Sequence, residues 1–275
     1  MGLERIDQIE QELSNITKIN DGGQKEVFSA MHPKYGKVAY KKVENLDREE
    51  KNRIEREANI LKDLDHEAFP KLYEIIFSED GTRCIILEEF IEGETLDKVM
   101  PNYYDPKEAL LLIRQITEIL SIIWDKRIVH RDIKPTNIMI GKDGKVTIID
   151  FGIARALDDK TITGFGGAPR TLLYAAPEQI KYEKAKITIR TDQFALGIIL
   201  GQMLFKGIHP YDEKLTRESN RVKAILNDNW YRNGIQGRPK LSALMERLLS
   251  THSHSRYPNA KRLIQAIDEA IGEWK

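Results

Sequence analysis

Two acids, a lysine and an asparagine near the middle of the chain have the types and spacing that phosphoryl transfer requires. Asp132, Lys134 and Asn137 lie in one short, proline-containing segment, and Asp150 follows the β-branched run 146–149. Such a run, bounded by a glycine, predicts a buried strand, so the two acids and the asparagine are expected on neighbouring loops. Carboxylate and amide oxygens placed in this way can hold Mg²⁺ on ATP, and an acid beside them can orient a substrate hydroxyl.

The order of these residues resembles a known family. Residues 130–137 read H-R-D-x-K-P-x-N and residues 150–152 read D-F-G, which is similar to the eukaryotic-type (Hanks-type) Ser/Thr protein kinase catalytic domain. The resemblance implies an α+β, two-lobed protein kinase fold, with a small β-rich N-lobe carrying one long helix and a larger, mostly helical C-lobe. It also implies transfer of the γ-phosphoryl group of ATP to protein Ser or Thr hydroxyls, with Mg²⁺ as cofactor.

The resemblance assigns a role to each residue of this segment. Asp132 is expected to act as the base or to orient the substrate hydroxyl, and Lys134 to neutralise charge on the transferred group. Asn137 and Asp150 are the expected ligands of Mg²⁺.

A second part of the site is expected upstream. Residues 38–41 match the family's V-A-I-K strand, so Lys41 is expected to hold the α- and β-phosphates of ATP. A lysine in an apolar strand needs a counter-charge. Glu57 is the expected partner, because it lies on a predicted long helix over 47–64, four residues before Leu61, as in the family's E-x-x-x-L.

Residues 19–28 predict a hairpin that covers the phosphates. The family pattern G-x-G-x-x-G-x-V falls on Asn20, Gly22, Lys25 and Val27, so only the middle glycine is kept. Asn20 is a mild departure, because asparagine tolerates left-handed dihedral angles. Lys25 is a larger departure, although its charge could reach a phosphate.

Residues 88–96 resemble the kinase hinge E-Y-V-x-G-x-T-L. The resemblance implies that adenine bonds to backbone groups near Glu89 and Ile91, in a nucleotide pocket that also includes Ala39. It places Glu88 at the gatekeeper position, where the family usually has an apolar residue. A carboxylate there needs a hydrogen-bond donor or a raised pKa.

Regulation is expected in the polar, glycine-bearing loop 153–174, which matches the activation segment. Arg131 before the catalytic Asp implies control by loop phosphorylation, with Thr161 and Thr163 as candidate acceptors. The alternative is an ordinary solvent-exposed loop. Three structural roles also follow from the resemblance: Thr171 contacts Asp132, Glu178 of the A-P-E motif pairs with Arg256, and Asp192 braces the catalytic loop.

The expected organisation has three parts. Apolar residues at helical spacing predict an N-terminal amphipathic helix over 1–18, the N-lobe and hinge occupy 19–91, and the C-lobe occupies 92–275. The chain carries little outside the catalytic domain. A regulatory partner is therefore expected in addition to protein substrates, unless the chain is a domain of something longer.

Composition excludes several function classes. The 275 residues include 43 Lys+Arg and 43 Asp+Glu, so no bulk charge favours nucleic acid. No apolar run approaches the roughly 20 residues of a membrane span. Cys84 is the single cysteine, which precludes an intrachain disulfide and favours a reducing, cytoplasmic location.

Two alternatives to an active kinase stay open. A nucleotide-binding pseudokinase scaffold is favoured by Asn20, Lys25 and Glu88 and opposed by the intact catalytic residues. A small-molecule phosphotransferase of the same fold is opposed by Lys134 and by the A-P-E motif, because such an enzyme needs no peptide-docking segment.

Overall fold

The computed structural model describes residues 2–22, 25–62, 64, 66–150, 173–212, 218–231, 235 and 237–274. The chain divides into two compact units, residues 1–93 with 141–167 and residues 94–140 with 168–275. Within the described residues, no helix is both long enough and apolar enough to span a membrane.

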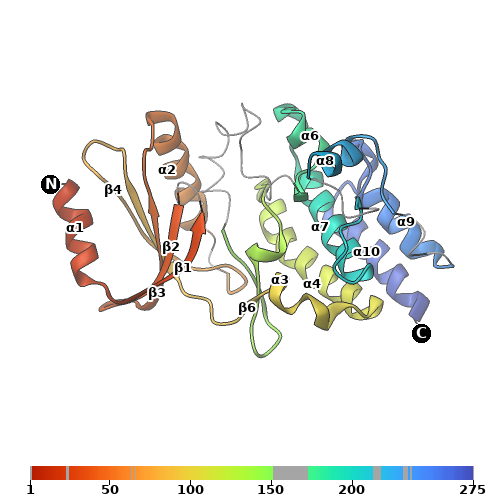
Figure 1. The fold of residues 1–275 in the computed structure, drawn as a ribbon, viewed down its shortest axis with the longest axis horizontal. Coiled ribbons are helices and arrows are strands. Elements are labelled where there is room, and N and C mark those ends of the chain that lie inside the picture. The colour runs from red at the N-terminus through yellow and green to blue at the C-terminus, as the bar shows by residue number, and fades with distance from the viewer. Residues whose placement is uncertain are drawn as a thin grey trace. The chain divides into compact units, whose positions relative to one another are not determined.

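The first unit is built on a five-stranded antiparallel sheet in the order β1-β2-β3-β5-β4. Its strands are β1 (Ser14–Gly22), β2 (Lys25–His32), β3 (Gly36–Val43), β4 (Leu72–Phe77) and β5 (Cys84–Glu89). Helices α1 (Gly2–Glu12) and α2 (Arg48–Lys62) lie on either side of the strands (Figure 1). The glycine-containing hairpin predicted over 19–28 is the β1–β2 hairpin.

The period-2 alternation of the strands gives this sheet two separate cores. Val38, Tyr40, Ile85 and Leu87 face α1, where they pack with its apolar residues Ile6, Ile9 and Leu13. Val43, Cys84 and Ile86 lie on the opposite face and pack with Ile54 of α2. Lys41 shares the strand parity of Val43, so the sequence places it on the α2 face.

The predicted helix over 1–18 is wrong in its C-terminal bound. Helix α1 ends at Glu12, and β1 begins at Ser14. Asn15 lies within β1 and has a left-handed φ of 51°, at a shift in the register of β1 against β2. Ile16, counted in the helical pattern, is 47% exposed on the strand. Ile16 and Thr17 are β-branched, which favours a strand, but the helical spacing of the apolar residues does not indicate one.

The predicted boundary at residue 92 also differs from the observed division. The described residues 141–150, expected in the C-lobe, group with the first unit. They include strand β8 (Val146–Ile148), whose Ile148 N–H donates to the carbonyl of Ala68 at 3.0 Å. Lys145 pairs with Glu67 in the same region at 3.1 Å.

The described part of the second unit is mostly helical. Its helices are α3 (Leu96–Val99), α4 (Pro106–Trp124), α6 (Pro177–Ile180), α7 (Ile189–Leu204), α8 (Glu218–Leu226), α9 (Pro239–Leu248) and α10 (Ala260–Ile271). The short strands β6 (Glu94–Thr95) and β7 (Ile138–Ile140) pair antiparallel, with Glu94 opposite Ile140.

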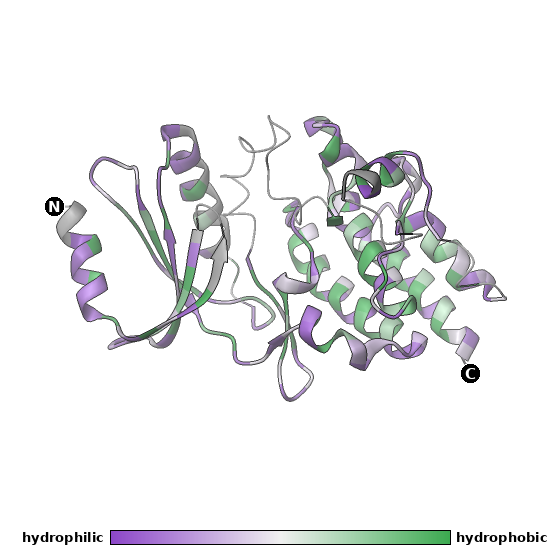
Figure 2. Cartoon of the chain, in the orientation of Figure 1, coloured by the Kyte–Doolittle hydropathy of each residue, from purple (hydrophilic) through white to green (hydrophobic). Residues whose placement is uncertain are grey.

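Helices α4 and α7 form the centre of this unit. Asp105 caps α4 by accepting the N–H groups of Lys107 at 2.9 Å and Glu108 at 3.1 Å, and Pro106 begins the helix, as the sequence predicts. Figure 2 shows apolar residues concentrated on α4 and α7. Gly197 lets α7 approach α9 closely, because a Cβ there would lie 2.8 Å from the Cβ of Leu248.

Candidate active site

The first unit holds the candidate nucleotide residues around Lys41. Lys41 lies on β3, an interior strand, and its side chain is only 6% exposed. Its ammonium group forms an ion pair with Glu88 and a 2.6 Å contact with Oδ1 of Asp150. Burial acts to lower the pKa of Lys41, but the carboxylates of Asp150 and Glu88 outweigh burial and raise it. Lys41 is therefore held as a cation.

Glu88, the unusual gatekeeper, has its hydrogen-bond donor in Lys41. It lies on β5 directly opposite Ala39 of β3, so its side chain and that of Lys41 are diagonal neighbours on one sheet face. The carboxylate is 10% exposed. The sequence indicated that this acid needs a donor, but it did not identify which residue supplies it.

Asp150 follows β8 in a left-handed conformation, with φ 58°. This conformation is uncommon for a residue other than glycine, although aspartate tolerates it better than most. Backbone strain of this kind concentrates at functional sites, where the surrounding structure maintains it. The carboxylate is 25% exposed, so it remains accessible beside Lys41.

Several predicted residues are described only in part. The backbones of Asn20, Gly22 and Lys25 lie in β1 and β2, with Asn20 opposite Val27, and Glu57 lies within α2. The side chains of Asn20, Lys25 and Glu57 are outside the described residues, so the Lys41–Glu57 pair stays a prediction. Thr161, Thr163 and Thr171 also lie outside the described residues.

The hinge has one backbone group already in use. The N–H of Glu89 donates to the carbonyl of Lys71 at 2.8 Å. That N–H group is therefore engaged within the first unit, and the predicted contacts of adenine with Glu89 and Ile91 stay a prediction. Ile91, half-buried, follows two residues later.

The second unit holds the catalytic loop, which is braced from α7 by Asp192. The fully buried carboxylate of Asp192 accepts the backbone N–H groups of His130 at 2.9 Å and Arg131 at 2.8 Å, and the indole N–H of Trp124 at 2.9 Å. Burial raises the pKa of Asp192, and His130 and these three donors act in the opposite direction. The brace holds Arg131 at φ 68°, a strained angle for arginine, immediately before Asp132.

Asp132, Lys134 and Asn137 converge within this loop. Lys134 Nζ lies 2.8 Å from Oδ2 of Asp132, and the amide nitrogen of Asn137 donates to the same oxygen at 3.0 Å. That nitrogen also donates to the Asp132 carbonyl at 2.9 Å. The carboxylate of Asp132 is thereby fixed in orientation. Because the amide nitrogen of Asn137 is used here, its oxygen is the atom that can serve as a metal ligand.

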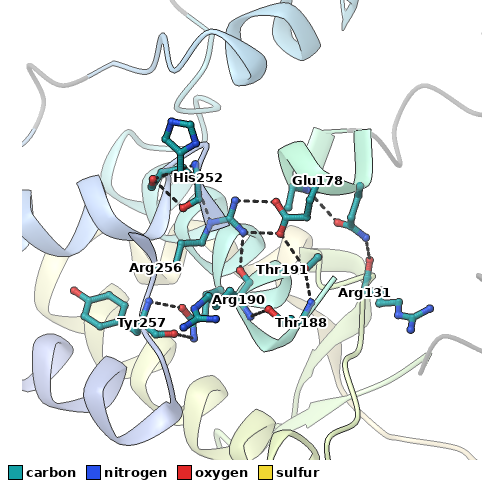
Figure 3. A network of polar contacts seen from close by, with 12 residues as sticks. Arg131, Glu178, Thr188, Arg190, Thr191, His252, Arg256 and Tyr257 are labelled. Atoms are coloured by element: carbon teal, nitrogen blue, oxygen red, sulfur yellow. Dashed lines mark hydrogen bonds and ion pairs between the residues drawn. The ribbon is translucent and has the colours of Figure 1, made fainter. Parts of the chain in front are cut away.

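The predicted partners Glu178 and Arg256 lie together in the buried network of Figure 3. Arg256 donates to both carboxylate oxygens of Glu178, at 2.7 and 3.0 Å, in a bidentate pair. Thr191 donates to the same carboxylate at 2.9 Å, and Arg256 also donates to the carbonyl of Arg190 at 2.9 Å. The helix that follows the activation segment is therefore anchored to α7 and to the 253–257 region.

Sequence reasoning missed Gln179. Its side chain reaches back to accept the N–H of Ala176 at 3.0 Å and donates to the carbonyl of Arg131 at 2.9 Å (Figure 3). It thus connects α6 to the residue that precedes Asp132. A glutamine at the third position of a helix is the one available signal, and that signal indicates capping rather than a link to a distant loop.

His209 contacts the C-terminal end of the loop 153–174 that was matched to the activation segment. Its Nε2 lies 2.9 Å from the carbonyl of Leu173, and its Nδ1 accepts the N–H of Tyr211 at 3.3 Å, which requires the neutral ring with its proton on Nε2. Burial lowers the pKa of His209 to about 4. The native state therefore favours the uncharged imidazole.

This depressed pKa predicts a pH dependence of folding. An unfolded histidine binds its proton near pH 6.5, whereas folded His209 does so near pH 4. Between these values the unfolded state binds more protons, so stability falls as pH drops from 6.5 toward 4, by about 3 kcal/mol in all. Urea unfolding at a series of pH values should show a shallower slope for His209→Gln than for wild type. The exposed His66 provides the control, and a His66→Gln slope as shallow as that of His209→Gln would contradict the assignment.

Binding of Mg²⁺ stays a prediction of the family resemblance. Among the residues that the structure describes, no three His, Cys, Asp or Glu side chains gather as a metal cluster. Mg²⁺ on a nucleotide needs only one or two protein oxygens in addition to phosphate oxygens and water. The carboxylate of Asp150 and the amide oxygen of Asn137 are ligands of that kind.

Comparison with known proteins identifies the family. The protein kinase domain model matches residues 13–266, which is most of the chain. Serine/threonine-protein kinase pkn2 of Myxococcus xanthus is 32% identical over 213 residues, covering 74% of this chain and 25% of that protein. Serine/threonine-protein kinase PknH of Mycobacterium tuberculosis is 31% identical over 262 residues, covering 92% and 41%. The chain belongs to the protein kinase domain family, and it spans a quarter to about two fifths of the length of these relatives.

Proposed function

We propose that this chain is a Ser/Thr protein kinase that transfers the γ-phosphoryl group of ATP to Ser or Thr hydroxyls of proteins. The observation that carries the proposal is the fixed carboxylate of Asp132, held by Lys134 and Asn137 in a loop braced by Asp192. The family membership and the names of the relatives support the same activity. The lysine at position 134 favours the Ser/Thr branch.

The residues of the first unit would bind the nucleotide. Lys41 supplies a permanent cation for the α- and β-phosphates, and backbone groups at Glu89 and Ile91 suit adenine. Asp150 and Asn137 would each supply an oxygen ligand to Mg²⁺, which would offset the negative charge of the phosphates.

Asp132 would orient the attacking hydroxyl in line with the γ-phosphorus and accept its proton as the new oxygen–phosphorus bond forms and the bond to ADP breaks. Lys134, 2.8 Å from that carboxylate, supplies a positive charge for the transferred group. Most of the catalysis in this mechanism comes from positioning and charge stabilisation, which is why a braced loop matters.

Regulation by phosphorylation is part of the proposal. The side chain of Arg131 is exposed although its backbone is held by Asp192 and Gln179. A phosphate on Thr161 or Thr163 would give this guanidinium a dianionic partner. Activity of the Thr161→Ala/Thr163→Ala variant is expected to fall about tenfold below that of the phosphorylated wild type. Equal activity of the two would exclude both threonines as the switch.

A nucleotide-binding pseudokinase is the second candidate. The acid Glu88 at the gatekeeper position favours it, because the family usually has an apolar residue there. The departures at Asn20 and Lys25 favour it as well. The complete set of Asp132, Asn137 and Asp150 favours the active kinase.

One experiment separates these candidates. The chain is incubated with Mg²⁺·ATP, alone and with a generic protein substrate, and phosphosites are mapped by mass spectrometry. An active kinase yields phosphoserine or phosphothreonine. ATP binding seen as a rise in melting temperature, with no phosphate transferred, indicates the pseudokinase. Phosphate found only on an added aminoglycoside or similar small molecule indicates a small-molecule phosphotransferase.

A further inference from the structure

The phosphate-binding lysine has a counter-ion built into its own sheet. Lys41 on β3 and Glu88 on β5 form a buried ion pair with side chains only 6% and 10% exposed. Ala39 lies directly opposite Glu88 in the register, which makes the charged pair diagonal neighbours. Both strands are interior to the sheet, so backbone hydrogen bonds on both sides fix this geometry.

The two carboxylates beside Lys41, those of Asp150 and Glu88, differ in their position relative to the five-stranded sheet. Asp150 lies outside the sheet, after β8, and is an expected magnesium ligand. Glu88 lies within β5, and no role other than its contact with Lys41 has been proposed for it. When phosphates replace Asp150 as a partner of Lys41, Glu88 can stay in place, because an ammonium group has three donors.

We propose that Glu88 is a positioning residue, a sheet-borne counter-ion that holds the Lys41 ammonium in its phosphate-binding position. Glu88 acts on the nucleotide through Lys41. This inference rests on the proposed nucleotide site and adds a second acid to it. It also explains why an acid is tolerated at the gatekeeper position.

The test is a double-mutant cycle on ADP binding without Mg²⁺, measured by titration calorimetry. Glu88→Gln keeps the shape of the side chain and removes its charge, which leaves Asp150 as the partner of Lys41 among the described side chains. ADP affinity is expected to fall about tenfold, because Lys41 is no longer pre-positioned. In the Lys41→Met background the same substitution is expected to change affinity less than about twofold. An equal loss in both backgrounds would overturn the proposal.

Lys41→Met leaves buried carboxylates without their cation, so a further variant guards against loss of the fold. Glu88→Asp restores the charge one methylene short of its native position and is expected to recover ADP affinity to within about threefold of wild type. An Asp variant as weak as the Gln variant would overturn a role through charge. The surface pair Glu67–Lys145 provides the matched control, and Glu67→Gln should bind ADP as wild type does.

The rate of phosphoryl transfer provides an independent test of the role of Glu88. Glu88→Gln is expected to lower kcat about 100-fold, since small displacements of a catalytic group carry losses of that size. A kcat within twofold of wild type would count against the proposal. If the wild type transfers no phosphate but the ADP cycle shows coupling, then the proposed function fails while the role of Glu88 stands.

Discussion

Replacing Asp132 with asparagine is expected to lower kcat by about 10³-fold, which is the range of general-base and orientation effects. The amide cannot accept the substrate proton, and it removes the negative charge that Lys134 contacts at 2.8 Å. ADP affinity should stay within about twofold of wild type, because Lys41, Glu88 and Asp150 are untouched. Steady-state kinetics with saturating ATP and calorimetric titration of ADP measure the two quantities separately.

Asp125→Asn is the matched control for this substitution. Asp125 is an exposed acid at the C-terminal end of α4, and its change should leave kcat within about twofold. A loss of less than tenfold for Asp132→Asn would mean that the loop does not supply the catalytic base. Parallel loss of ADP binding would mean that the variant has lost its fold.

The largest effect on stability is expected from Arg256→Met. Arg256 is fully buried and makes the bidentate pair with Glu178, whose side chain is 2% exposed. Methionine fills similar volume but leaves the carboxylate buried without its cation, which costs about 3–5 kcal/mol. The melting temperature should fall by about 10 °C. Urea unfolding monitored by circular dichroism gives the free energy of unfolding directly.

Two further variants test the cause of this loss. Arg114→Met removes a surface arginine that pairs with Asp268 and Glu118, and should change stability by less than about 1 kcal/mol. Arg256→Met/Glu178→Leu removes both buried charges and should recover much of the loss. Equal losses for Arg114→Met and Arg256→Met would show that the loss of stability does not depend on burial of the Arg256–Glu178 pair.

Local patterns in the sequence were sufficient for much of the fold. The hairpin predicted over 19–28 is the β1–β2 hairpin, and the strand predicted over 146–149 is β8. Helix α2 lies within the range predicted for the long helix over 47–64. The N-terminal helix was predicted too long, because Ile16 satisfies a helical spacing and yet lies on a strand. Spacing alone does not distinguish the two conformations when a helix passes directly into a strand.

Contacts in the candidate site could be predicted from the sequence where a family motif includes both partners. Glu178 with Arg256 and Asp192 with the loop backbone are contacts of this kind. The contact of Lys41 with Glu88 depends on the register of β3 against β5, which no local pattern specifies. The contact of Gln179 with Arg131 was not predicted, because its partner is a backbone carbonyl. Every residue has such a carbonyl, so no residue type in the sequence indicates this partner.

The most direct test of the central claim compares two products of one reaction. Wild-type chain, Mg²⁺·ATP and a generic protein substrate are incubated together, and ADP and acid-stable phosphate on protein are quantified over time. Both products are expected in equal amounts, with the phosphate on Ser or Thr, and Asp132→Asn is expected to lower both by about 10³-fold. ADP formed without phosphoprotein, or neither product from a chain that binds ATP, would contradict the assignment of kinase activity.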